Sequence, residues 1–205
     1  MFQNYIPITL RDAGPEAPEY IMDSVSYTNK LPSPRFIKSH LPYDFLPRQI
    51  RDGTKKPKIV YVTRNPKDTC ISYFHHSKLL TGYGGDFDDF CKLFIDGKIG
   101  YAPFWKYALG YSSRRNDENM LFLTYEDMKA DLASVIRKVA DFLGKSVDGV
   151  YDSKNVEMLM NHLSFESMKA NPAVNYESHV DSLKALKMTD PDRSFMRSGK
   201  TDQWK

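Results

Sequence analysis

The chain has 205 residues, which is enough for one domain with a substantial core and too few for two large domains. Its 41% hydrophobic and 13% aromatic residues are typical of a globular protein, and a formal charge of +3 is too small to indicate a nucleic-acid partner or a polybasic membrane anchor. Because no apolar stretch reaches the length of a membrane span and the first residues do not resemble a secretory signal, we expect a cytoplasmic protein.

The first 30 residues predict an irregular N-terminal lead with one helical turn around residues 20–26. The region to residue 34 contains five prolines and little hydrophobic periodicity. Because a domain seldom opens with so long an irregular segment, we expect part of the domain to be absent ahead of it. We therefore treat residues 1–205 as a single, incomplete domain.

A short strand is predicted at residues 35–39, between Pro34 and Pro42. His40 then follows the carboxyl end of this strand, and Lys38 lies two residues earlier. Side chains two apart on a strand share a face, so a cation and a proton acceptor would point to one place. This pair suits transfer of an anionic group onto a hydroxyl, whereas the alternative is a purely structural histidine.

The central prediction is a strand at residues 59–62, a tight turn, and a helix that begins at Pro66. The continuous apolar run indicates a strand buried on both faces, as in a parallel sheet. Arg64 follows its carboxyl end, where ligands bind in α/β sheets, and Ser72 lies on the helix. A guanidinium and a hydroxyl near a helix start can bind phosphate, or the arginine can simply pair with a carboxylate.

Further elements alternate along the chain. A helix at residues 87–94 should end at Gly97, and an aromatic-rich helix should cover residues 101–111. Some of its aromatic side chains belong to the core and some could line an acceptor pocket. A second buried strand is expected at residues 120–125, and a helix capped by Asp131 should end at Gly144. This alternation predicts a three-layer α/β domain with a central parallel sheet.

The C-terminal third predicts one more helix at residues 156–162 and a mobile polar loop or lid at residues 170–194. The sequence Gly199-Lys200-Thr201 imitates the end of a nucleotide P-loop, but Ser194 stands where the first glycine would be required. Cys70 and Cys91 lie in apolar helical contexts, so we expect core thiols and no disulfide framework. The five histidines show no metal-ligand spacing, and we expect no metal.

Together these segments, from about residue 30 to the end, resemble the cytosolic sulfotransferases, a P-loop-like α/β family that transfers a sulfuryl group from 3′-phosphoadenosine-5′-phosphosulfate (PAPS) to a hydroxyl or amine. The segment from Arg35 to Pro42 resembles the family's Lys-Thr/Ser-His-Leu-Pro motif. The resemblance implies that His40 is the catalytic base and that Lys38 steadies the transferred group. It also implies that Lys38, Ser39 and His40 contact the acceptor.

The resemblance also implies a nucleotide site. The segment from Arg64 to Ser72 resembles the 3′-phosphate motif, and Tyr125 resembles the tyrosine near the adenine. The remaining implied nucleotide contacts are Leu163, Ser164, Phe165, Met168, Arg197, Ser198 and Gly199. Leu163 replaces a usual threonine, and Ser198 and Asp202-Gln203 depart from the family's C-terminal signature, so Arg197 is the firmest contact there. The product would be 3′,5′-adenosine bisphosphate, formed without a metal.

Two family segments are not found in this sequence. One is the N-terminal strand and the loop of the type Tyr-Pro-Lys-Ser-Gly-Thr-Thr-Trp, which holds the 5′-phosphosulfate, and the other is the C-terminal dimer contact. We therefore expect a sulfotransferase chain that lacks these segments, with an oligomer still possible. Loss of one oxyanion-type donor typically costs about 10²–10³ in rate.

The sequence thus predicts sulfuryl transfer from PAPS to a small hydroxylated acceptor. The first alternative is a non-catalytic homologue that binds 3′,5′-adenosine bisphosphate or a partner chain. A carbohydrate sulfotransferase of the secretory pathway and a nucleotide kinase are weaker alternatives, because the chain shows neither a membrane anchor nor a P-loop.

Overall fold

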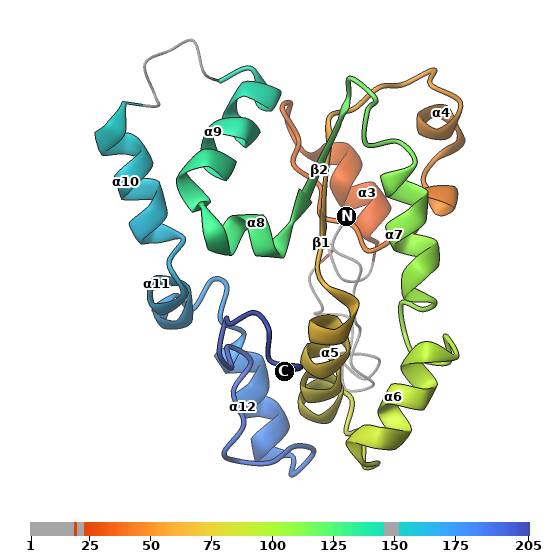
Figure 1. The fold of residues 1–205 in the computed structure, drawn as a ribbon, viewed down its shortest axis with the longest axis vertical. Helices are drawn as coiled ribbons and strands as arrows, with labels where there is room; N and C mark the ends of the chain where they lie inside the picture. The colour runs from red at the N-terminus through yellow and green to blue at the C-terminus, as the bar shows by residue number, and fades with distance from the viewer. Residues whose placement is uncertain (1–18, 20–22, 146–151) are drawn as a thin grey trace.

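The computed structural model describes residue 19, residues 23–145 and residues 152–205. Its centre is a pair of parallel strands, β1 (Ile59–Thr63) and β2 (Met120–Thr124), in a register that sets Ile59 opposite Met120 and Thr63 opposite Thr124. Figure 1 shows helices on both sides of this pair, with α8 and α9 on one side and α7 on the other, while α5 lies beyond the end of β1. The predicted α/β architecture with a parallel sheet is confirmed.

The described helices surround the two strands in chain order. They are α3 (Ser24–Lys30), η1 (Tyr43–Phe45), α4 (Arg48–Arg51), α5 (Pro66–Leu80), α6 (Phe87–Ile95), α7 (Phe104–Ser112), α8 (Tyr125–Ala130), α9 (Leu132–Leu143), α10 (Ser153–His162), α11 (Phe165–Ala170) and α12 (Glu177–Ala185). Three of them link β1 to β2, as a parallel connection requires.

Local sequence explains where several helices begin and end. Asn65 caps α5, because its side chain accepts a hydrogen bond from the Lys67 backbone N–H, and Pro66 occupies the first turn. Asp131 caps α9 by accepting from the Ser134 N–H, as predicted. Gly144 ends that helix at φ +72°, a left-handed conformation that favours glycine.

An aromatic core beside the sheet fixes the segment that leads to His40. The Tyr61 and Tyr111 rings stack with centroids 4.1 Å apart, and Tyr43 packs edge-on against Tyr111. The buried Tyr111 hydroxyl donates to the Leu41 carbonyl at 2.8 Å. This hydrogen bond holds the backbone one residue after His40 against the core.

Two strand predictions are corrected. Residues 35–39 form no strand, because they are exposed and pair with no described strand. The strand β1 is not buried on both faces, since Val60 and Val62 are 42% and 46% exposed. In both cases the residues have the predicted composition, but the described chain supplies nothing that covers or pairs with them.

Three other segments differ from expectation. The predicted loop at residues 170–194 contains helix α12, whose Val180 and Leu183 are buried. The aromatic-rich helix begins at Phe104, after Pro103, and not at residue 101. Residues 24–30 are helical and overlap the helical turn predicted at residues 20–26, whereas residues 1–18 and 20–22 lie outside the described residues.

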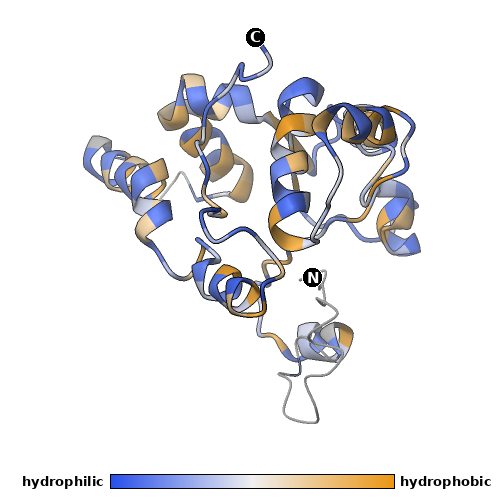
Figure 2. Cartoon of the chain, turned by 90° about the horizontal axis from the view of Figure 1, so that it is seen from below, coloured by the Kyte–Doolittle hydropathy of each residue, from blue (hydrophilic) through white to orange (hydrophobic). Residues whose placement is uncertain are grey.

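The helices carry hydrophilic and hydrophobic residues along the same length, as Figure 2 shows. In the part of the chain that the structure describes, no helix is long and apolar enough to cross a membrane.

Cys70 on α5 and Cys91 on α6 are free thiols with their sulfur atoms 3.6 Å apart. Desolvation, with Cys91 contributing, raises the pKa of Cys70 to about 12, so this thiol stays protonated and acts as a core residue.

Candidate functional site

The strand register brings together two residues that are 61 positions apart in the chain. Because Thr63 lies opposite Thr124, the next residues, Arg64 and Tyr125, emerge side by side at the carboxyl ends of the strands. The Arg64 guanidinium carbon lies 4.4 Å from the centre of the Tyr125 ring, a cation–π contact. The Asn65 backbone N–H donates to Glu126 at 3.0 Å and ties the two turns together.

The last residues of the chain, 194–205, pack onto these strand ends, and we call them the C-terminal segment. Arg64 Nη2 donates to the Lys200 carbonyl at 2.7 Å, and the Tyr125 hydroxyl donates to the Gly199 carbonyl at 3.0 Å. Gly199 has φ +60°, and a Cβ atom there would overlap the Phe165 ring at the start of α11. Glycine is therefore required at this close approach.

The resulting group of Arg64, Tyr125, Phe165, Arg197 and Gly199 is named the arginine cluster. The Arg64 side chain is only 20% exposed. The pKa of Arg197 is lowered by desolvation and by the positive charge of Arg64, while Asp68 acts in the opposite sense. The largely buried guanidinium of Arg64 and that of the exposed residue Arg197 repel one another, and together they provide a favourable site for an anion.

Arg64 has the carboxylate partner that one of its two interpretations required, whereas phosphate binding stays a prediction. It forms an ion pair with the buried Asp68 at 3.8 Å, as a structural arginine would. Its Nε atom is nevertheless buried without a hydrogen-bond partner among the described residues. An unpaired donor inside a cationic cluster fits a phosphate oxygen, because leaving a buried N–H unsatisfied is costly.

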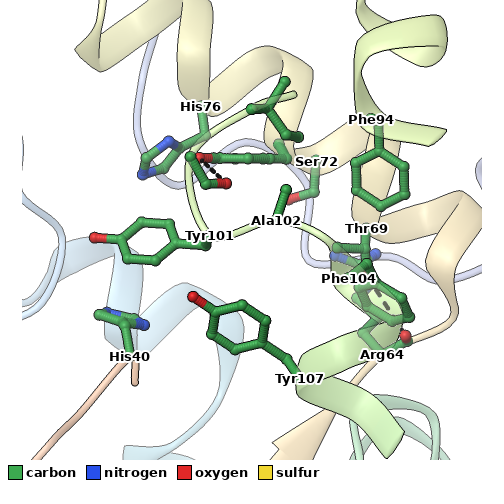
Figure 3. Close-up of a pocket in the computed structure, with 13 residues that line it drawn as sticks. His40, Arg64, Thr69, Ser72, His76, Phe94, Tyr101, Ala102, Phe104 and Tyr107 are labelled. Carbon is green, nitrogen blue, oxygen red and sulfur yellow. Dashed lines mark hydrogen bonds between the residues drawn. The ribbon is translucent and has the colours of Figure 1, made fainter. Parts of the chain in front are cut away.

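Beside the arginine cluster lies a cavity of about 420 Å³ whose walls come from α5, from α7 and from the loop before α7. Its aromatic members include Tyr73, Phe94, Tyr101, Phe104 and Tyr107. Figure 3 shows this cavity, which we call the aromatic pocket, with His40 and Tyr101 near one another and Ser72 and Arg64 also at its walls. The Tyr73 hydroxyl donates to the Gly100 carbonyl at 2.9 Å and joins α5 to the loop.

His40 lies at the edge of the aromatic pocket, with its ring 5.2 Å from the Tyr101 ring. Its pKa is lowered, chiefly by desolvation and to a smaller degree by the charge of Lys38. Because a lower pKa favours neutral imidazole, the geometry provides a proton acceptor at a pocket for a small molecule. Lys38 and His40 together line an adjoining cavity of about 460 Å³, so they do face one space.

The other residues that were predicted to contact the nucleotide or the acceptor lie in several parts of the structure. Ser39 accepts from the Leu41 N–H at 3.1 Å, Ser164 caps α11, and Ser198 accepts from Gln203 Nε2 at 2.9 Å. Met168 lies on α11, one turn beyond Phe165. Leu163 follows the end of α10 and is 39% exposed. The structure thus gathers Arg64, Tyr125, Phe165 and the C-terminal segment, whereas Leu163 remains at the surface.

The sequence did not predict a role for Asp68, and it left open whether the aromatic side chains belong to the core or to a pocket. Asp68, which is 2% exposed, accepts backbone hydrogen bonds from the C-terminal segment, and nothing in the spacing of the sequence indicated that contact. The pocket aromatics lie at helical spacing that also suits a core, so only the fold could separate the two roles. Among the described residues, no group of three or more potential metal ligands occurs.

This chain is similar in sequence to known proteins. The family model described as "Sulfotransferase domain" matches residues 5–205. The chain is 47% identical over 192 residues to luciferin sulfotransferase of Photinus pyralis, covering 94% of this chain and 51% of that protein. It is 35% identical over 189 residues to amine sulfotransferase of Oryctolagus cuniculus, covering 91% of this chain and 60% of that protein.

Solved structures are similar to this chain as well. The crystal structure of retinol dehydratase in complex with androsterone and the inactive cofactor PAP matches with a TM-score of 0.75 and 34% identity, over 87% of this chain and 50% of that one. Mouse sulfotransferase SULT7A1 complexed with PAP matches with a TM-score of 0.70 and 27% identity, over 87% of this chain and 61% of that one. The chain thus spans about half to three fifths of the relatives that it matches.

Proposed function

The chain belongs to the sulfotransferase family, and we propose that its protein transfers a sulfuryl group from PAPS to a hydroxyl of a small, ring-bearing acceptor. The observation that carries this proposal is the arginine cluster at the strand ends, directly beside the aromatic pocket. An anionic nucleotide needs a cationic site and an apolar acceptor needs an apolar site. For transfer between them, the two sites must be neighbours, as the arginine cluster and the aromatic pocket are.

The arginine cluster suits the 3′-phosphate of the donor. Arg64 presents a buried Nε without a partner among the described residues, and Arg197 lies close enough for the two charges to interact. Ser72 on α5 lines the aromatic pocket together with Arg64, so its hydroxyl can donate to the same phosphate. Two structural relatives were crystallised in complex with PAP, which supports a nucleotide of this kind.

The aromatic pocket suits the acceptor. Aromatic side chains on several walls offer edge and face contacts to a planar ring. Two relatives are named for luciferin and for amines as acceptors, which supports a hydroxyl or an amine as the reacting group. The aromatic lining favours an acceptor in which that group is carried by a ring system.

His40 would act as the general base. Its neutral imidazole accepts the proton of the acceptor hydroxyl while the oxygen attacks sulfur, forming the new S–O bond. The bond from sulfur to the bridging phosphate oxygen breaks, and 3′,5′-adenosine bisphosphate leaves with that electron pair. Lys38 shares a cavity with His40 and supplies a positive charge for the oxygens of the transferred group.

The first test is calorimetric titration of the purified chain with 3′,5′-adenosine bisphosphate and with adenosine 5′-monophosphate. We expect the bisphosphate to bind more tightly, and Arg64→Ala to weaken its binding by about tenfold or more while changing monophosphate binding much less, since a charge-assisted hydrogen bond contributes about 1.5–3 kcal/mol. Arg48→Ala is the control, because the Arg48 side chain is 88% exposed on the separate helix α4.

Equal affinity of the unmodified chain for the two nucleotides would refute the phosphate assignment. Bisphosphate binding without any transfer from PAPS to phenolic or amine acceptors would instead favour the alternative of a non-catalytic homologue. Transfer that survives His40→Ala undiminished would remove His40 from the mechanism.

A further inference from the structure

The buried carboxylate of Asp68 is the one acidic group that enters the arginine cluster from α5. It lies in the first turn of that helix, is 2% exposed, and does not line the aromatic pocket. Burying a charge in this way is costly unless hydrogen bonds and an opposite charge compensate it. The partners of Asp68 therefore indicate what its burial achieves.

Both oxygens of Asp68 are occupied by the C-terminal segment. Oδ2 accepts the backbone N–H of Asp202 at 2.8 Å, and Oδ1 accepts the backbone N–H of Gln203 at 2.9 Å. These two consecutive donors come from residues more than 130 positions later in the chain. Asp202 has φ +59°, so the backbone turns sharply where it meets the carboxylate.

The same contacts arrange the two arginines. Asp68 lies 3.8 Å from Arg64, whose Nη2 in turn donates to the Lys200 carbonyl at 2.7 Å. Gln203, once held by Asp68, accepts from Arg197 and donates through Nε2 to the Lys200 carbonyl at 2.9 Å. One carboxylate thus fixes a loop whose side chains and carbonyls orient Arg64 and Arg197.

We propose that Asp68 is a positioning residue: it holds the C-terminal segment on α5 so that Arg197 and Arg64 converge on one phosphate group. Its charge offsets the repulsion between the two guanidinium groups while no ligand is bound. Because both of its oxygens are already occupied, it does not present an open carboxylate to the incoming anion. That this anion is the 3′-phosphate of a nucleotide rests on the proposed function.

The first measurement needs no nucleotide. Trp204 stacks under Lys67, whose Nζ lies 3.6 Å from the ring centre, and a Trp105→Phe background leaves Trp204 as the sole tryptophan. In that background we expect Asp68→Asn to shift Trp204 emission toward that of a solvated indole and to speed tryptic cleavage after Arg197 and Lys200. The matched control is Asp131→Asn, an exposed helix cap at which asparagine also caps well.

The second measurement is the ratio of dissociation constants for adenosine 5′-monophosphate and 3′,5′-adenosine bisphosphate. We expect Asp68→Asn to reduce this ratio by about tenfold, because hydrogen bonds to a charged group are lost and about 1.4 kcal/mol corresponds to a factor of ten. A purely structural role would weaken both nucleotides alike and leave the ratio unchanged, which would overturn the proposal.

A second pair of variants keeps α5 intact in case Asp68→Asn does not fold. Gln203→Pro removes the N–H that Asp68 accepts, whereas Gln203→Ala removes the side chain and keeps the N–H. We expect the proline variant to release the segment more than the alanine variant, and equal release would contradict the proposal. If the unmodified chain binds neither nucleotide, the proposed function fails, and the cleavage and fluorescence data alone decide whether Asp68 holds the segment.

Discussion

At the scale of single residues, the site depends on ionisable side chains that are partly removed from water. Arg64 was expected either to bind phosphate or to pair with a carboxylate, and it has both an ion-pair partner and an unpaired buried donor. His40 lies beside Tyr101, and its pKa is lowered first by desolvation and then by the charge of Lys38, which disfavour its protonated form. A motif names such residues, whereas their burial and their contacts depend on the fold.

The lowered pKa of His40 predicts the pH dependence of the proposed transfer. Neutral imidazole is the active base, so the rate should stay constant as the pH falls through the ordinary histidine value of about 6.5 and decline only at lower pH. Lys38→Gln removes a charge that disfavours protonation, so the decline should move to higher pH. An NMR titration of the His40 ring, assigned with His40→Ala, measures the shift independently of activity. A midpoint above the ordinary value would contradict this account.

At the scale of elements, the site is built where structural elements end. Both strands stop in register, and the residues that follow them form the cation–π pair. The start of α5 carries Asp68, the start of α11 carries Phe165, and the C-terminal segment joins the two. Helix ends and turns have backbone groups without helical partners, so their contacts can be made to distant segments.

Two glycines in left-handed conformations should respond differently to alanine. Gly144→Ala should lower the free energy of unfolding by about 1 kcal/mol without changing nucleotide affinity, because its Cβ would meet only Lys58 Nζ at 3.8 Å. Gly199→Ala should weaken bisphosphate binding by about tenfold, since its Cβ would also overlap the Phe165 ring. Urea unfolding and calorimetry measure the two effects. Gly84→Ala, which meets nothing within 4 Å, is the control.

At the scale of the whole molecule, the described chain combines a helix-rich body with a small, partly exposed sheet. The aromatic core packs against β1 and β2, yet Val60 and Val62 remain exposed on β1. The arginine cluster joins α8, α11 and the C-terminal segment, and Asp68 ties that segment to α5. A ligand at the arginine cluster would therefore connect segments from both halves of the chain.

We expect 3′,5′-adenosine bisphosphate to raise the unfolding temperature of the chain. A ligand at 100 times its dissociation constant stabilises the folded state by about 2.7 kcal/mol. Arg64→Ala should abolish most of the increase at the same ligand concentration, whereas Arg48→Ala should retain it. Differential scanning fluorimetry over a range of concentrations measures the effect. An increase of the same size in the Arg64 variant would mean that the nucleotide binds elsewhere.

The sequence by itself determined the two strands, most of the helices, the limits of α9 at Asp131 and Gly144, and the family. These features depend on periodicity, on capping residues such as Asp131 and on local motifs, all of which act over a few neighbouring positions. The sequence also predicted Arg64, Tyr125 and Arg197 as site residues, through their resemblance to family motifs.

Only the tertiary structure decided what covers, pairs with or holds these elements. A strand at residues 35–39 did not form, because strand formation needs a hydrogen-bonding partner that local composition cannot supply. The helix α12 formed in a weakly patterned segment, because Val180 and Leu183 are buried against the rest of the chain. The role of Asp68 depends on two N–H groups more than 130 residues away, a contact that chain folding creates and sequence spacing does not encode.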